Sequence, residues 1–420
     1  MTKRKIENLD LKIRLTNEYI NNGGVENIWD KELLQDLMKV KGDSITGETD
    51  PDTVSPRVNA FMNAILMSHM MPPVFHEHHI SEYESTLQKW NSFDQWNIDT
   101  KEQFDVIYEK WKGATDALFR GQKEAKWRLY SNLQRLWLTN KLFDTEESYH
   151  KLIENMINLG KAEFGQQIKQ ILKTNHIDSE NTVSVLGYLQ HHGCPTPLLD
   201  WTYKFQNALY FGIDGLVPCS GKVEIEDYFS VYFILEKHFI GGDWRAMIQE
   251  ALDKAEPIML NKEIAKIAKG DEKKRKAMEK HFAGRKLFDK TRFSGSGLIN
   301  RMTSLELLMQ SSIGYFSDRG IDSGILFSMN NSKNILNQAG VFTWNPFPSK
   351  PLEMVGEEDY PGDEEAKRNY KFCSCFNINK KLAEYIKQRL EADGITKEFI
   401  YPTPDISTKG VFEKAKRKAI

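Results

Sequence analysis

The sequence predicts an α+β protein with a helical N-terminal region. Two patterns support this fold class. Apolar residues recur at helical spacing over 145–173, and the runs at 222–240 and 370–378 are rich in β-branched and aromatic residues, as strands are. Because the two patterns alternate along 420 residues, we expect a mixed α/β core behind the helical front, and more than one structural unit.

The N-terminal region, residues 1–99, is expected to be mostly helical. A polar stretch at 41–57 predicts an exposed loop or linker. The apolar run at 58–71 stops at a diproline and predicts a buried helix too short to span a bilayer. This region is also where we expect a protein partner to bind, if there is one.

The elements from residue 100 onward have clear boundary signals. Thr100 and Gln103 form the pattern of a capping box, and an apolar stripe follows them as far as Trp111. A short apolar strand is expected at 117–122, and a helix at 182–192 should end at Gly193. Further elements are predicted as a strand-like passage at 198–202, a helix at 203–215, strands at 323–329, 340–344, 370–378 and 398–402, and a helix at 380–394.

The density of charged residues predicts one segment that lies outside the core. The segment 251–290 is rich in Lys and Glu and predicts a solvated helical insertion. We therefore divide the chain into a helical N-terminal region, 1–99, the first part of the core, 100–250, the charged insertion, 251–290, and the C-terminal strands and helix of the core, 291–420.

Composition limits the classes of function. The net charge is −2, so no overall positive field would attract nucleic acid or an anionic membrane, and we expect neither as a partner. The chain has 4 cysteines, and Cys373 and Cys375 are too close for an ordinary disulfide, which fits a reducing cytoplasm. Without an apolar stretch of 18 residues, we expect a cytoplasmic protein.

Arg120 is the first candidate for chemistry. It follows an apolar strand-like run and precedes Gly121, so its side chain should leave the end of a strand beside a tight turn. A guanidinium offers a planar fork of donors that suits phosphate or carboxylate. The alternative is a structural arginine paired with an internal aspartate.

A second polar cluster lies at 190–202. Burying so many hydrogen-bonding groups without partners would be costly, so they either satisfy one another or line a polar cleft. His191 and His192 should point about 100° apart on a helix, so we expect only one of them to face such a cleft. The cluster consists of Gln190, His191, His192, Thr196, Asp200, Trp201 and Thr202.

Metal binding is not expected. His76 and His79 lack the HExxH spacing, and the Cys373–Cys375 pair has no second ligand pair nearby. The chain also contains no glycine-rich phosphate loop with its lysine and no nucleophile elbow.

The two polar motifs together resemble the FRG domain. They read "LFRGQ" at 118–122 and "LQHHGCPTPLLDWT" at 189–202, with Trp127 and Arg135 between them, and "NQAGVFTW" at 337–344 is similar to a downstream element of that family. Pro197 stands where the family usually has Arg. This departure leaves Arg120 and Arg135 as the expected anion-binding residues.

A weaker resemblance is to ADP-ribosyltransferases of the Arg-Ser-Glu type, which have a split sheet. It implies that Arg120 holds the phosphate or ribose of NAD, that Asp200 and Thr202 stand in for the Ser-Thr strand, and that Gln338 occupies the place of the glutamate. Because glutamine carries no negative charge, the missing carboxylate could come from Asp200 if that side chain faces the cleft.

These resemblances define the expected site. Its catalytic residues would be Arg120, His192, Asp200 and Gln338. Its NAD-binding residues would be Arg120, Gly121, Gln122, Arg135, Gln190, His191, Thr196, Trp201 and Thr202.

Three functions remain open. In the first, the protein binds a nucleotide such as NAD and transfers or hydrolyses ADP-ribose, acting on a nucleotide or nucleotide-modified substrate, as a bacterial toxin or phage-defence effector would. In the second, the FRG motifs form a non-catalytic module that recognises a ligand or partner. In the third, the same residues form only a structural polar network.

Overall fold

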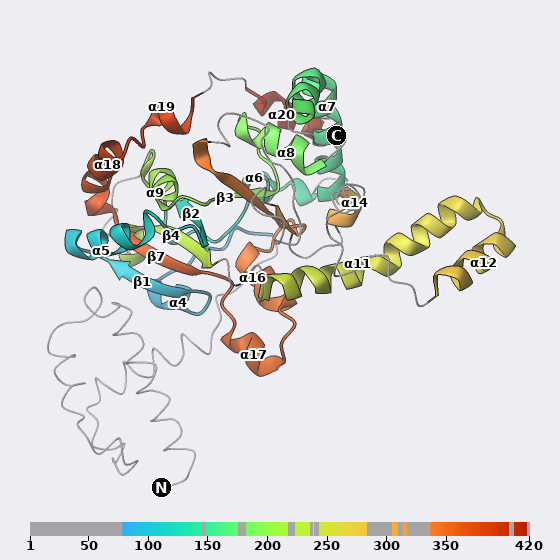
Figure 1. Cartoon of the computed structure of the whole chain (residues 1–420), viewed down its shortest axis with the longest axis horizontal. Helices are drawn as coiled ribbons and strands as arrows, with labels where there is room; N and C mark the ends of the chain where they lie inside the picture. The colour runs from blue at the N-terminus through green and yellow to red at the C-terminus, as the bar shows by residue number, and fades with distance from the viewer. Residues whose placement is uncertain are drawn as a thin grey trace, which may run out of the picture.

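The structure is a computed structural model (Figure 1). It describes residues 78–144, 148–174, 182–216, 223–235, 238, 243–283, 305–309, 314–316, 337–402 and 407–417. The expected helix at 58–71 and the expected strand at 323–329 lie outside the described residues.

A seven-stranded mixed sheet forms the centre of the described structure. Its order is β1-β7-β4-β2-β3-β6-β5, with β1 and β7 parallel and the other neighbours antiparallel. The strands are β1 (Asp94–Ile98), β2 (Ala117–Gln122), β3 (Leu198–Thr202), β4 (Tyr228–Leu235), β5 (Gly314–Phe316), β6 (Gly340–Trp344) and β7 (Ser374–Asn379). Together with the helices this confirms the α+β class.

The junction between β2 and β3 differs from those on either side. β2 pairs with β4 from Ala117 to Gln122, and β3 pairs with β6 over its whole length. Between β2 and β3 themselves, the register holds one pair, Phe119 and Thr202. The two strands are therefore joined at one point in the middle of the sheet.

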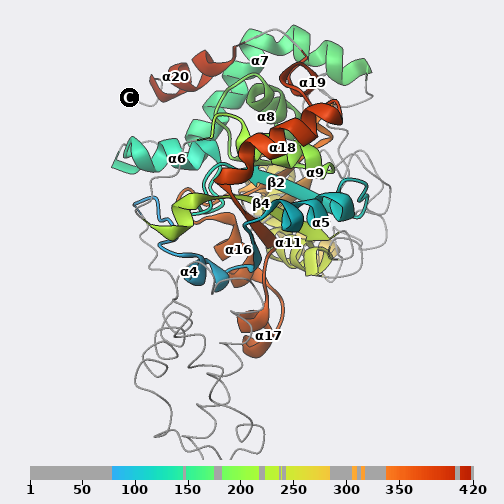
Figure 2. The same cartoon turned by 90° about the vertical axis from the view of Figure 1, so that its left-hand side faces the viewer.

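Helices cover both faces of the sheet (Figures 1 and 2). α5 (Lys101–Trp111), α9 (Phe205–Ile213) and α18 (Ala383–Ala392) lie on one face. The other face and its margins carry α4 (Thr86–Trp90), α6 (Asn132–Thr139), α7 (Tyr149–Thr174), α8 (Thr182–His191), α14 (Leu305–Leu308), α16 (Leu352–Asp359), α17 (Glu364–Asn369) and α20 (Lys409–Arg417), and the short α19 (Lys397–Ile400) follows α18.

Two apolar cores result from this arrangement, one on each side of the sheet. Strand alternation assigns the residues of β2: Ala117 and Phe119 pack toward α5 and α9, whereas Leu118 packs toward α7 and α8. Arg120 follows the same alternation, so it leaves the strand on the α8 side. Gly121 faces α9.

Most of the expected boundaries are confirmed. Thr100 and Gln103 form the capping box of α5, and Gly193 follows α8 with a φ of +91°, in the left-handed region that ends helices. The expected helix at 145–173 corresponds to α7, and the strands expected at 117–122 and 340–344 are β2 and β6.

Two expectations need correction. Residues 94–98, inside the region expected to be mostly helical, form edge strand β1 beside β7. Residues 398–402 were expected to be a strand, but 397–400 form α19, because the Thr396 side chain accepts a hydrogen bond from the Phe399 amide and caps a helical turn.

The charged segment forms a helical hairpin of α11 (Asp243–Ala268) and α12 (Glu272–Phe282) that projects from the rest of the protein (Figure 1). α11 starts earlier than the expected insertion. Ile264 and Ala268 are buried in the hairpin, while α12 has no buried residue.

Candidate functional site

A cavity of about 350 Å³ opens beside the junction of β2 and β3. Its volume is near the lower end of the roughly 300–1,000 Å³ of small-molecule sites. The lining residues are Phe119, Arg120, Gly121, Lys123, Asn132, Gln190, His191, Asp200, Trp201, Thr202, Phe211, Gln338 and Tyr401. Eight of the expected site residues, from both polar motifs and including Gln338, therefore meet in one place.

Arg120 and Asp200 are 80 positions apart and line this cavity together. The Arg120 Nη1 donates a hydrogen bond of 2.6 Å to the Asp200 main-chain carbonyl. Burial lowers the pKa of the guanidinium, and the negative charge of Asp200 opposes that effect. The Arg120 Nε is buried and has no hydrogen-bond partner among the described residues. Arg120 thus has a donor that no described residue satisfies.

Gly121 allows a helix to approach the strand that carries Arg120. A Cβ at this position would lie 1.8 Å from the Ala208 carbonyl oxygen and 2.7 Å from the Gly212 amide nitrogen, both in the backbone of α9. A side chain here would have to displace α9. The glycine of the "RG" pair therefore has a packing role as well as a place in the cavity wall.

A chain of hydrogen bonds orients the Asp200 carboxylate. Thr196 Oγ1 accepts a hydrogen bond from the Leu198 amide at 3.2 Å and donates to Gln190 Oε1. This turns the Gln190 amino group toward Asp200, where Nε2 donates to Oδ1 at 2.6 Å. The Gln190 side chain therefore fixes the orientation of the Asp200 carboxyl group.

The two adjacent histidines have different surroundings. His191 lines the cavity, and its Nε2 is buried without a hydrogen-bond partner in the described structure. Burial lowers its pKa, while the charge of Asp200 raises it. His192 is not among the lining residues, and its ring packs 4.5 Å from the ring of Tyr188. The histidine expected to be catalytic thus lies outside the cavity, and its neighbour lies inside.

Gln338 lines the cavity but is also held by the surrounding backbone. Its side-chain Nε2 donates to the Ile400 carbonyl at 3.2 Å, and its main-chain carbonyl accepts from Thr202 Oγ1 at 2.5 Å. The next residue, Ala339, has a φ of +48°, which is strained for a residue with a Cβ. These contacts hold the residues just before β6 against β3 and α19 and occupy the side-chain nitrogen of Gln338.

Three expected binding residues lie outside the set that lines the cavity: Gln122, Arg135 and Thr196. Gln122 Nε2 donates to the Trp127 carbonyl at 2.6 Å. The Arg135 guanidinium stacks over Trp127 at 4.9 Å and donates to the Arg128 carbonyl. Burial, together with the positive charge of Arg120, lowers the pKa of Arg135 to about 10. Arg135 therefore lies near Arg120 but is not among the residues that line the cavity.

Sequence reasoning missed five lining residues: Phe119, Lys123, Asn132, Phe211 and Tyr401. Lys123 and Phe119 are within three residues of Arg120 and could have been found by extending the first motif. Tyr401 comes from a segment that was expected to be a strand.

Residues 115–216 match the family model of the FRG domain. The chain contains an FRG domain. Comparison with curated proteins gives no match, and neither does comparison with solved structures. Only Gln338 and Tyr401 among the lining residues come from outside the matched segment, so the FRG domain supplies nearly the whole cavity.

The FRG domain thus presents a cavity of mixed charge. Arg120 and Lys123 are its strong cations, and Asp200 is the one carboxylate among its described lining residues. Within the described residues, no group of three or more His, Cys, Asp and Glu side chains could hold a metal ion. None of the helices that the structure describes is long and apolar enough to cross a membrane.

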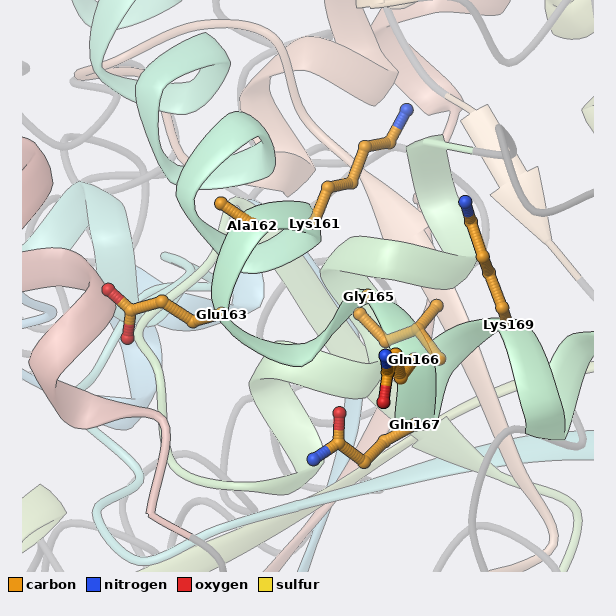
Figure 3. Close-up of a pocket in the computed structure, with 8 residues that line it drawn as sticks. Lys161, Ala162, Glu163, Gly165, Gln166, Gln167 and Lys169 are labelled. Carbon is orange, nitrogen blue, oxygen red and sulfur yellow. The ribbon is translucent and has the colours of Figure 1, made fainter.

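A second hollow, of about 420 Å³, follows α7 outside the FRG motifs (Figure 3). Its lining residues all belong to that one helix, within 161–169. Their side chains do not converge, because Glu163 extends away from Lys161 and Lys169. The cavity at the β2–β3 junction is the better candidate site.

Proposed function

We propose that the FRG-domain cavity binds a phosphate-bearing nucleotide, with NAD as the leading candidate, and cleaves the bond between nicotinamide and ribose. The observation that carries the proposal is that Arg120, with a buried donor unsatisfied by the described residues, and the oriented carboxylate of Asp200 line one cavity. Phosphate suits the guanidinium fork, and Lys123 adds a second cation.

Each residue then has a role in the reaction. As the bond from C1′ of the ribose to the nicotinamide nitrogen breaks, its electron pair neutralises the positive ring and nicotinamide leaves. The charge that develops on the ribose is stabilised by Asp200, which Gln190 orients. An attacking water or acceptor hydroxyl bonds to C1′ and gives its proton to His191, whose lowered pKa favours the neutral, proton-accepting ring.

This proposal keeps Asp200 in the role that the sequence suggested and changes the histidine. Asp200 takes the part of the charged carboxylate, because Gln338 is neutral and its amide is bound to the Ile400 carbonyl. His191 takes the place of His192, which was expected to be catalytic, because His191 lines the cavity. An enzyme that consumes NAD or transfers ADP-ribose would suit a toxin or phage-defence effector, and we include that role in the proposal.

The test follows the fate of labelled NAD. The full chain is incubated with NAD labelled in the nicotinamide and, separately, in the adenylate part, while free nicotinamide and label on macromolecules are measured. Release without transfer would indicate hydrolysis, and both together would indicate transfer. Asp200→Asn keeps the size of the side chain and should abolish release, whereas Glu163→Gln, on the surface of α7, should not. Equal rates in wild type and Asp200→Asn would refute the catalytic role.

One observation favours a second candidate, a recognition module without catalysis. Thr196, Gln190 and Asp200 satisfy one another in a rigid network that could hold the binding surface without reacting. In that case NAD or another nucleotide would raise the Tm of the wild type but not of Arg120→Ala, and no nicotinamide would be released from wild type.

A further inference from the structure

Tyr401 is the lining residue that the FRG match and the polar motifs leave unexplained. It directly follows α19 and lies far outside the matched segment, 115–216. Its side chain is 40% exposed, yet it lines the same cavity as Arg120 and Asp200. A large aromatic ring that is partly exposed at a polar cavity has an apolar surface available for a ligand.

The backbone that carries Tyr401 is held firmly. Its amide donates to the Lys397 carbonyl at 2.8 Å, and the preceding residue, Ile400, is completely buried. The last residues of α19 also accept hydrogen bonds from the start of β6: Asn337 Nδ2 donates to the Phe399 carbonyl at 2.7 Å, and Gln338 Nε2 donates to the Ile400 carbonyl. The exposed ring is therefore attached to a fixed support.

Other aromatic groups adjoin this ring. Tyr210 meets it edge-on, with ring centroids 6.3 Å apart and planes at 65°, and Phe211 lines the cavity as well. In such a pair one ring points its edge at the other, so Tyr210 covers at most one face of the Tyr401 ring. The face that Tyr210 does not cover can stack on a planar group, which is how aromatic side chains bind nucleobases.

The size of the cavity indicates that different parts of the ligand would contact different residues. At about 350 Å³ it lies at the small end of ligand sites, so a dinucleotide would extend beyond it. Arg120 and Lys123 offer a place for phosphate, and Tyr401 offers one for a flat heterocycle.

We propose that Tyr401 is a specificity-determining residue that stacks on a heterocyclic base of the nucleotide, so that the C-terminal segment selects the ligand that the FRG domain binds. This inference rests on the proposed function for its phosphate-bearing ligand. It assigns a ligand contact to a residue in a part of the chain that lies outside both FRG motifs.

The test compares ligands with and without a base. Binding of NAD, AMP and ribose 5-phosphate to the full chain is measured by calorimetry for wild type, Tyr401→Ala, Tyr401→Leu and Tyr401→Phe. Tyr401→Ala and Tyr401→Leu should weaken NAD and AMP binding roughly 5- to 150-fold, because stacking contributes about 1–3 kcal/mol per base. Ribose 5-phosphate should bind unchanged, and Tyr401→Phe should behave as wild type. Tyr401→Leu retains apolar bulk if Tyr401→Ala fails to fold.

A matched control is Trp96→Ala, because Trp96 is 38% exposed and lies on edge strand β1. It should bind all three probes as wild type does. Unchanged affinity of Tyr401→Leu for NAD and AMP would overturn the inference, and so would an equal loss of ribose 5-phosphate binding. If the wild type binds the probes, and if Arg120→Ala weakens that binding while the Tyr401 variants do not, only this inference fails. If no probe binds the wild type, the proposed function fails with it.

Discussion

The Arg120 guanidinium donates a 2.6 Å hydrogen bond to the main-chain carbonyl of Asp200, across the junction where β2 and β3 share one register pair. This bond links the two polar motifs of the FRG domain through the backbone. It leaves the Asp200 carboxylate to accept from Gln190, and it leaves the Arg120 Nε without a partner among the described residues. The side chains of both residues can therefore contact a ligand in the cavity.

Arg120→Ala should separate ligand binding from folding. The hydrogen bond that is lost goes to a main-chain carbonyl, and the Asp200 carboxylate keeps its bond from Gln190. We expect unfolding free energy to fall by about 1.5 kcal/mol, less than the about 3–5 kcal/mol of a broken buried ion pair. Affinity for NAD should fall by about 1.5–3 kcal/mol for each bond removed, and Arg120→Lys should recover only part of it. Urea unfolding and calorimetry measure the two effects.

Arg135→Ala is the matched control, because it removes the same charge from a residue that does not line the cavity. It should lose the stacking on Trp127 and some stability but retain nucleotide affinity. Loss of binding in Arg135→Ala with retention in Arg120→Ala would reverse our assignment of the anion site. A loss of about 3–5 kcal/mol in unliganded Arg120→Ala would make Arg120 a structural residue instead.

Gly121→Ala should strongly destabilise the protein. The new Cβ would lie within 1.8 Å of a carbonyl oxygen of α9, and a helix backbone cannot rotate away as a side chain can. Overpacking of this kind costs about 1–3 kcal/mol or more. Gly113→Ala is the control, because a Cβ there would meet nothing within 4 Å among the described residues beyond its chain neighbours, and its Tm should stay near that of wild type. Equal Tm values for both variants would show that α9 can shift freely.

Much of the site could be predicted from sequence because local patterns determine it. Arg120 ends an apolar run, and the prolines at 195 and 197 force the extended passage that becomes β3, so the polar side chains leave at strand positions. The choice between His191 and His192 was different. His191 is the last residue of α8 and His192 follows it, and the packing of His192 against Tyr188 and of His191 against Phe342 decides which ring lies outside the cavity.

The parts that sequence missed depend on contacts between distant segments. β1 is a strand because it pairs with β7, about 280 residues later in the chain, and its own sequence, "DQWNI", is short and polar. Tyr401 reaches the cavity because Asn337 and Gln338 hold the end of α19. No pattern within 398–402 could reveal those bonds.

The distal part of the α11–α12 hairpin should be dispensable for folding. α12 has no buried residue, and the hairpin projects from the rest of the protein (Figure 1). Replacing residues 258–282 with a short Gly-Ser linker should leave a folded protein with a Tm within a few degrees of wild type. Circular dichroism and size-exclusion chromatography report the outcome. An insoluble product would show that the hairpin is integral to the fold.

Glu357 should make the protein less stable as the pH rises. Burial raises its pKa to about 7 from an ordinary value of 4.5, although the positive charge of Lys371 opposes the shift. The folded state therefore holds this proton more tightly than the unfolded state, and the stability this provides is present below pH 4.5 and lost as the pH rises through about 7. The unfolding free energy of Glu357→Gln should match that of wild type near pH 4.5 and exceed it at pH 8. A constant difference across that range would contradict the burial of the carboxyl.

His191 should produce the opposite trend. Burial lowers its pKa below the ordinary 6.5, so the unfolded chain binds a proton there more readily than the folded protein does. Stability is then complete above pH 6.5 and falls as the pH decreases through that value, by at most about 1.4 kcal/mol per pH unit. Urea unfolding at pH 7.5 and 5.5 measures this effect. Between these two pH values, His191→Gln should lose less unfolding free energy than wild type does.

His192→Gln supplies the comparison that separates burial from function. Burial lowers the pKa of His192 as well, so this variant should also reduce the loss of stability at acidic pH. The two variants should differ in the cavity, because only His191 lines it and has an unpartnered Nε2 among the described residues. We therefore expect His191→Gln to impair nicotinamide release from NAD and His192→Gln to retain it. Since the variants are equal in charge and adjacent in sequence, a greater loss of release in His192→Gln would show that the wrong ring has been assigned to the reaction.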